Sequence, residues 1–88
     1  MTEYTYKELE SLWNKKADEV LTGKTIKAVR YMTRDEADKW GWSKCPVCIF
    51  FTDGTWMLPQ ADDEGNDGGA ILIEPLDETK ENILPTLF

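Results

Sequence analysis

The chain contains 88 residues, of which 41% are apolar, and its formal net charge is −7 at pH 7. This length corresponds to one domain, because compact domains contain about 50 to 250 residues. The sequence contains no histidine, which excludes nucleophilic catalysis by Ser-His and Cys-His pairs and removes the most common general base and metal ligand.

The excess of acidic over basic residues lies in the last third of the chain. Residues 1–60 contain nine acidic and nine basic side chains, whereas residues 61–88 contain eight acidic side chains and a single basic one, Lys80. Nucleic-acid binding depends on cationic side chains that displace counterions, so this charge disfavours direct contact with DNA or RNA. The longest apolar run, Val47 to Phe51, is far shorter than the ~20 residues of a membrane-spanning helix. We therefore expect a cytoplasmic protein that binds neither nucleic acid nor membrane.

The first predicted element is an amphipathic helix over residues 6–21. Thr5 and Glu8 have the spacing of a capping box, in which each side chain accepts a hydrogen bond from the other residue's backbone amide. Gly23 follows the helix and suits the left-handed conformation that ends one. Apolar residues recur at the spacing that aligns one helix face: Leu9, Leu12, Trp13, Ala17, Val20 and Leu21. We expect this face, Trp13 included, to form part of the core.

Four strands are predicted after the helix, over residues 24–32, 47–52, 55–58 and 70–74. A second capping box, Thr33 to Glu36, predicts a short helical turn that ends at Gly41. Asp53-Gly54 predicts a two-residue hairpin turn of type I′. In the tail, residues 76–88, a turn of helix is expected around residues 77–84.

One helix followed by several strands predicts an α+β domain that spans residues 1–88. We expect the N-terminal amphipathic helix to pack on a small curved antiparallel sheet. An SH3-like, partly closed barrel is the expected version of this architecture.

Several segments together resemble a known family. They are Gly23-Lys24-Thr25-Ile26, Val29-Arg30-Tyr31-Met32-Thr33, Gly41-Trp42, Asp53-Gly54-Thr55, Pro59 and Asp62-Asp63-Glu64-Gly65-Asn66-Asp67-Gly68-Gly69. Over about residues 21–73 the chain resembles small uncharacterised "hypothetical" proteins from bacteria and their phages. The resemblance implies a shared fold unit and carries no assigned activity. The chain departs from the family at Cys45-Pro46-Val47-Cys48, where an arginine before the proline is more usual, which argues against a family-wide role for the cysteines.

The two cysteines form a C-x-x-C pattern, Cys45 to Cys48. In redox enzymes the first cysteine of this pattern opens a helix, which lowers its pKa; here a strand follows. Side chains three residues apart on a strand leave by opposite faces, so we expect two ordinary thiols with neither a disulfide nor a shared metal. A structural zinc needs four ligands, which two chains could supply only across a dimer.

The acidic loop, residues 60–69, concentrates oxygen-bearing side chains: Asp62, Asp63, Glu64, Asn66 and Asp67. Residues 63–74 partly match a calcium loop, but Gly65 stands where an oxygen ligand is required and the flanking elements are strands. The alternatives are a solvated acidic connection and a weak Ca²⁺ or Mg²⁺ site. We expect no bound metal and no cofactor, and we expect the carboxylates to matter for binding more than for folding, because clustered like charges add repulsion.

The chain contains four tryptophans, and the sequence predicts a location for each. Trp13 is assigned to the core and Trp56 to the core or a sheet face. Trp40 and Trp42 flank Gly41 and either cover the end of the barrel or form a recognition surface, because tryptophan is enriched in binding hot spots.

These features predict a small, non-enzymatic protein-binding or regulatory module that contacts a protein partner through Trp40, Trp42 and the acidic loop. The first alternative is a phage-type inhibitor whose acidic C-terminal third occupies a basic groove of a host protein. The second is a cation-binding or carboxylate-based enzyme. Salt dependence of binding separates the first two classes.

Overall fold

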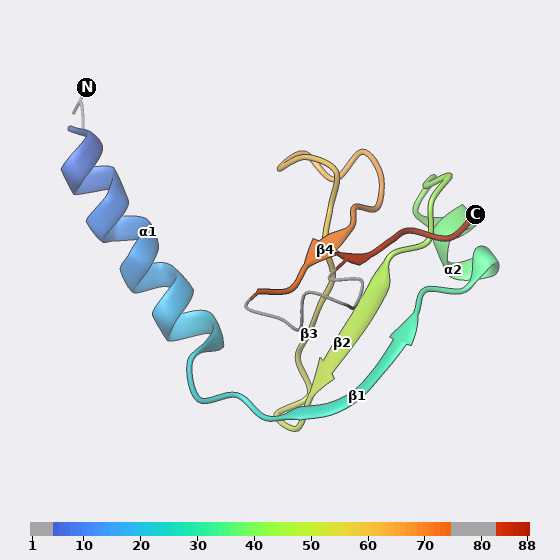
Figure 1. The fold of residues 1–88 in the computed structure, drawn as a ribbon, viewed down its shortest axis with the longest axis horizontal. Coiled ribbons are helices and arrows are strands. Elements are labelled where there is room, and N and C mark those ends of the chain that lie inside the picture. The colour runs from blue at the N-terminus through green and yellow to red at the C-terminus, as the bar shows by residue number, and fades with distance from the viewer. Residues whose placement is uncertain (1–4, 75–82) are drawn as a thin grey trace.

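The computed structural model describes residues 5–74 and 83–88, which form two helices and five strands in an α+β arrangement (Figure 1). In chain order these are α1 (Tyr6–Leu21), β1 (Ile26–Tyr31), α2 (Arg34–Lys39), β2 (Val47–Phe51), β3 (Trp56–Met57), β4 (Ile71–Leu72) and β5 (Ile83–Leu84). Each of the four predicted strand regions contains a strand, and the α+β class is confirmed.

The helix α1 begins and ends where the sequence predicts. Thr5 caps it, with its Oγ1 accepting a hydrogen bond from the Glu8 amide at 3.1 Å. Gly23 follows the helix with φ +81°, the left-handed conformation that glycine adopts without strain.

The packing predicted for α1 is wrong. The helix stands apart from the sheet in Figure 1, and none of its residues is buried. Trp13, expected in the core, is 64% exposed. The Cα radius of gyration is 15.6 Å, compared with about 12 Å for a compact chain of this length. A 3.6-residue apolar period identifies a face that gains by burial, but it does not specify which surface covers that face.

The strands β1, β2 and β3 form an antiparallel sheet in that order, which does not close into a barrel. A bulge at Lys27, between the pairs Ile26–Phe51 and Ala28–Phe50, shifts the alternation in β1. The register then assigns side chains to two faces. The α2 face carries Ala28, Arg30, Cys48, Phe50 and Trp56, and the apolar face carries Ile26, Val29, Tyr31, Val47, Ile49, Phe51 and Met57.

The turn between β2 and β3 differs from the predicted type I′ turn. Only Gly54 has a positive φ, +90°, and Asp53 does not. The Phe51 amide donates to the Thr55 carbonyl at 2.9 Å, and the Gly54 amide donates to the Phe51 carbonyl at 3.2 Å. These bonds enclose a three-residue loop with glycine in the left-handed position.

The tail does not form the predicted helical turn at its C-terminal end. Ile83 and Leu84 pair with Leu72 and Ile71 as β5 of a second, two-stranded antiparallel sheet. Residues 77–82 of that prediction lie outside the described residues.

The core lies between α2 and the sheet. Its buried cluster consists of Met32, Ala37, Trp42, Cys45 and Cys48, with Phe50 and Leu58 packed against it. Across residues 5–74 and 83–88, neither helix has the length and apolar content needed to cross a bilayer.

Candidate functional site

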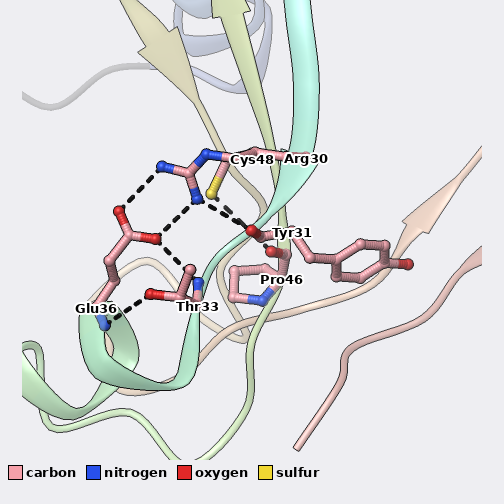
Figure 2. A network of polar contacts seen from close by, with 6 residues as sticks. All are labelled: Arg30, Tyr31, Thr33, Glu36, Pro46 and Cys48. Carbon is pink, nitrogen blue, oxygen red and sulfur yellow. Dashed lines mark hydrogen bonds and ion pairs between the residues drawn. The ribbon is translucent and has the colours of Figure 1, made fainter.

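Arg30 connects β1 to α2 (Figure 2). Its guanidinium donates to both carboxylate oxygens of Glu36, at 2.8 and 3.0 Å. Glu36 Oε1 also accepts from the Thr33 amide at 2.9 Å, and Thr33 Oγ1 accepts from the Glu36 amide at 3.1 Å, which completes the predicted capping box. The Arg30 hydrogen bonds, followed by the Thr33 amide, lower the pKa of Glu36 from 4.5 to about 2. These bonds connect the first turn of α2 to β1.

A row of aromatic rings crosses the α2 face of the sheet; we call Phe50, Trp56, Trp40 and Trp42 the aromatic row. Phe50 stacks on Trp56 with 5.6 Å between centroids and 10° between planes. Trp56 and Trp40 lie 5.7 Å apart, and Trp40 meets Trp42 edge to face at 4.9 Å. The Arg30 guanidinium lies 5.2 Å from the Phe50 ring centroid, a cation–π distance that extends the row by one charged group.

The two tryptophans that flank Gly41 have different environments. Trp42 is 4% exposed and belongs to the core cluster. Its Nε1 donates to the Gly65 carbonyl at 2.8 Å, so it also holds the acidic loop. Trp40, at the C-terminus of α2, is 48% exposed, and Trp56 beside it is 43% exposed. Of the predicted pair, Trp42 is a buried residue that packs against the Trp40 ring, and Trp40 is exposed to solvent.

The Asp62 carboxylate is used within the acidic loop. It accepts from the Glu64 amide at 3.0 Å, the Asn66 amide at 3.3 Å and the Asn66 side-chain amide at 3.0 Å. These bonds, the Asn66 side chain first, lower the pKa of Asp62. The Asp62 carboxylate therefore stabilises the loop by accepting hydrogen bonds from its amides. The sequence predicted a role in binding for this residue.

The Asp67 carboxylate connects the acidic loop to the segment before β2. It accepts from Ser43 Oγ at 2.8 Å, the Lys44 amide at 3.0 Å and the Gly68 amide at 2.9 Å. These bonds, the Lys44 amide first, lower the pKa of Asp67. Asp63 is exposed, and Glu64 makes one long contact, 3.4 Å from the Asn66 side-chain amide. The five acidic-loop candidates thus divide into structural Asp62, Asn66 and Asp67 and solvent-facing Asp63 and Glu64.

The cation and enzyme alternatives gain no support from the described part of the chain. It contains no group of three or more carboxylate or thiol side chains placed to hold a metal ion. The surface hollows beside α1 are lined by residues of that helix alone, such as Lys7, Glu10, Ser11 and Asn14. They are gaps between exposed side chains, whereas binding sites for small molecules are usually enclosed clefts.

The cysteines are free and buried, and both belong to the core cluster. The predicted separation to opposite faces is wrong because Cys45 precedes β2, where strand alternation does not apply; it pairs with Leu87 in an isolated bridge. The Cys48 thiol lies 3.9 Å from the Pro46 carbonyl (Figure 2), and burial raises its pKa. A raised pKa disfavours the reactive thiolate.

Sequence reasoning did not identify Phe50 or Arg30 as part of the site. A two-residue turn would pair Phe51 with Trp56, whereas the three-residue loop pairs Phe50 with Trp56. This shift of one residue moves Trp56 to the α2 face, beside Trp40. The Asp-Gly pair was the available signal, and it is compatible with both turns.

The chain matches no family model, no curated protein and no solved structure. The resemblance to small bacterial and phage proteins therefore stays a prediction.

Proposed function

We propose that this protein is a non-enzymatic protein-binding module that contacts a polypeptide partner through Trp40 and Trp56 of the aromatic row. The observation that carries the proposal is the exposure of these two adjacent rings, 48% and 43%. Tryptophan is among the residues most enriched at binding hot spots, because its large rigid ring is buried at low entropic cost.

The support under these rings favours recognition. Trp40 rests edge to face on buried Trp42, and Trp56 stacks against Phe50 on the neighbouring strand. The Arg30–Glu36 ion pair connects β1 to α2, whose C-cap residue is Trp40. Both rings are thus pre-oriented, which reduces the ordering cost of binding.

The test is affinity capture from native lysate on the immobilised chain, followed by titration of the captured protein with variants. Trp40→Ala and Trp56→Ala should each weaken binding about 10-fold or more, while Leu72→Ala, which removes a 63% exposed side chain on β4, should leave it unchanged. Equal binding by all three variants contradicts the proposal.

A salt titration of the same complex tests the acidic-inhibitor alternative. Contact through aromatic rings predicts affinity that changes little with salt, because little charge is paired. A steep loss with salt that persists in Trp40→Ala would instead favour the acidic C-terminal third as the binding surface.

A further inference from the structure

We propose that Trp40 and Trp56, the exposed aromatic pair, bind an uncharged proline-rich segment in the polyproline II conformation, with one proline ring on each indole. This inference rests on the proposed function and names the chemistry of the partner segment. Three features of the exposed aromatic pair carry it: the unpartnered indole N–H groups, the spacing of the rings and the paired charges around them.

The exposed aromatic pair offers hydrogen-bond donors to a ligand. The Trp42 indole N–H donates to the Gly65 carbonyl at 2.8 Å, whereas those of Trp40 and Trp56 have no acceptor among residues 5–74 and 83–88. An indole is a donor only, so the best-matched ligand supplies carbonyl oxygens without N–H groups that compete for them. Proline has no N–H, and a polyproline II segment has no internal hydrogen bonds. Its carbonyls are therefore available to both indoles.

The spacing of the two rings fits alternate residues of such a segment. The centroids of Trp40 and Trp56 lie 5.7 Å apart, with 52° between the ring planes. Polyproline II has three residues per turn and rises about 3.1 Å per residue, so alternate residues lie on two of its three edges, about 6 Å apart along the axis. The tilt between the indoles allows each one to meet a different edge.

Both surfaces exist before they meet. Phe50 stacks on Trp56, and buried Trp42 packs edge to face against Trp40. A polyproline II segment is likewise preformed, so little conformational entropy is lost when it binds.

The charges around the exposed aromatic pair favour an uncharged ligand. Ion pairs at 2.8 to 3.0 Å neutralise the segments that carry the row: Arg30–Glu36, Arg34–Asp38 and Lys24–Asp53. Lys39, next to Trp40, makes no ion pair within the described residues and would repel a cationic ligand. The net charge of −7 disfavours an anionic one. An uncharged segment also agrees with the weak salt dependence expected of this surface.

The test is a titration of the ¹⁵N-labelled chain with an N-acetylated proline decamer, followed by NMR of the four indole N–H signals. The Trp40 and Trp56 signals should shift, with a dissociation constant between ~10 μM and ~1 mM. The Trp42 and Trp13 signals should stay in place, and Trp13 is the matched control because it is 64% exposed but lies on α1. The absence of any shift at Trp40 and Trp56 up to ~5 mM decamer, or equal shifts at all three exposed indoles, would overturn the inference.

Substitutions separate the contribution of the ring from that of the donor. Trp40→Ala removes both and should raise the dissociation constant of the decamer by about 10-fold or more, whereas Trp40→Phe keeps a flat ring and should raise it by about 3- to 10-fold. Trp13→Ala should bind like the wild type. Circular dichroism should show all three variants folded, because these positions are exposed. Wild-type affinity in Trp40→Ala contradicts the inference.

Charged decamers test whether the ligand is uncharged. Decamers of alternating lysine and serine, and of alternating glutamate and serine, should each bind at least about 10-fold more weakly than the proline decamer. Equal or tighter binding of either one overturns the inference.

Competition distinguishes this inference from the proposed function. The proline decamer should displace the captured partner from the wild-type chain. If capture requires Trp40 and Trp56 but the decamer does not displace the partner, this inference fails and the proposed function stands. If the partner binds Trp40→Ala and Trp56→Ala normally, the proposed function fails, even where the decamer binds.

Discussion

Replacement of Trp42 by alanine should produce a large loss of stability. Trp42 is 4% exposed within the core cluster, and its Nε1 donates to the Gly65 carbonyl at 2.8 Å. Emptying a buried Trp site costs about 3 to 5 kcal/mol, including the cavity. The lost hydrogen bond contributes about 1 kcal/mol of that change, because the Gly65 carbonyl loses its partner. A chain of 88 residues has a total stability of about 4 to 13 kcal/mol, so Trp42→Ala removes a large fraction of it.

Urea unfolding followed by circular dichroism measures this loss. Two further variants serve as comparisons for this loss of stability. Trp42→Phe keeps most of the ring volume but not the donor, so it should lose about 1 to 2 kcal/mol. Trp13→Ala should change stability by less than about 0.5 kcal/mol, because Trp13 is 64% exposed.

The losses of stability in the three variants test whether Trp42 is a core residue and whether α1 packs on its own sheet. If Trp13→Ala costs as much as Trp42→Ala, α1 packs on its own sheet and the arrangement in Figure 1 is refuted. If Trp42→Ala costs less than about 1 kcal/mol, Trp42 is not a core residue and the support assigned to Trp40 is absent.

The remaining predictions concern charge and thiols. Bonds from Arg30 and Thr55 hold the pKa of Glu36 and of Asp53 to about 2, so both carboxylates stabilise the fold above about pH 4.5 and lose that effect as the pH falls from about 5 to about 2. Thermal unfolding of Glu36→Gln should depend less on pH in that window than the wild type; an equal dependence contradicts the assignment. Asp67→Asn should lower the melting temperature by several degrees and Asp63→Asn should not, because of these two carboxylates only Asp67 accepts hydrogen bonds from backbone amides. Equal shifts of the melting temperature would contradict the structural role assigned to Asp67. Both cysteines should react with a thiol reagent only after unfolding and without prior reduction, and a fraction that requires a reductant would reveal a disulfide.

Much of the local structure could be predicted from the sequence because its signals are local. The two Thr-x-x-Glu boxes and the glycines after them define where α1 and α2 begin and end. The strand regions follow from β-branched and aromatic runs. Each signal depends on residues within about four positions of one another, the range over which backbone hydrogen bonds set helix ends and turns.

The errors arose where a distant contact or a turn of ambiguous length decides the outcome. The stripe of α1 has a helical period, but the linker after the helix is held to the β2–β3 turn by the Lys24 contacts with Asp53 and Thr55. Those residues lie about 30 positions away along the chain, and no local pattern relates them to α1. Likewise the Asp-Gly pair fits loops of two or three residues, and only the second brings Trp56 beside Trp40.

Trp40, Trp42 and the acidic loop are predicted from the sequence as one binding surface. In the structure, hydrogen bonds join the loop to Trp42 and to the segment that follows it. Asp67 joins the loop to Ser43 and Lys44, immediately after Trp42, and Trp42 Nε1 binds the Gly65 carbonyl in the same loop. Neutralising Asp67 therefore weakens the hydrogen bonds that hold the segment after Trp42. The Trp40 ring, which packs on Trp42, then loses its support. A loop substitution that weakens partner binding is thus no evidence for a contact between partner and carboxylate. Trp40→Ala, which leaves the bonds of Trp42 and the loop in place, is the substitution that isolates recognition from support.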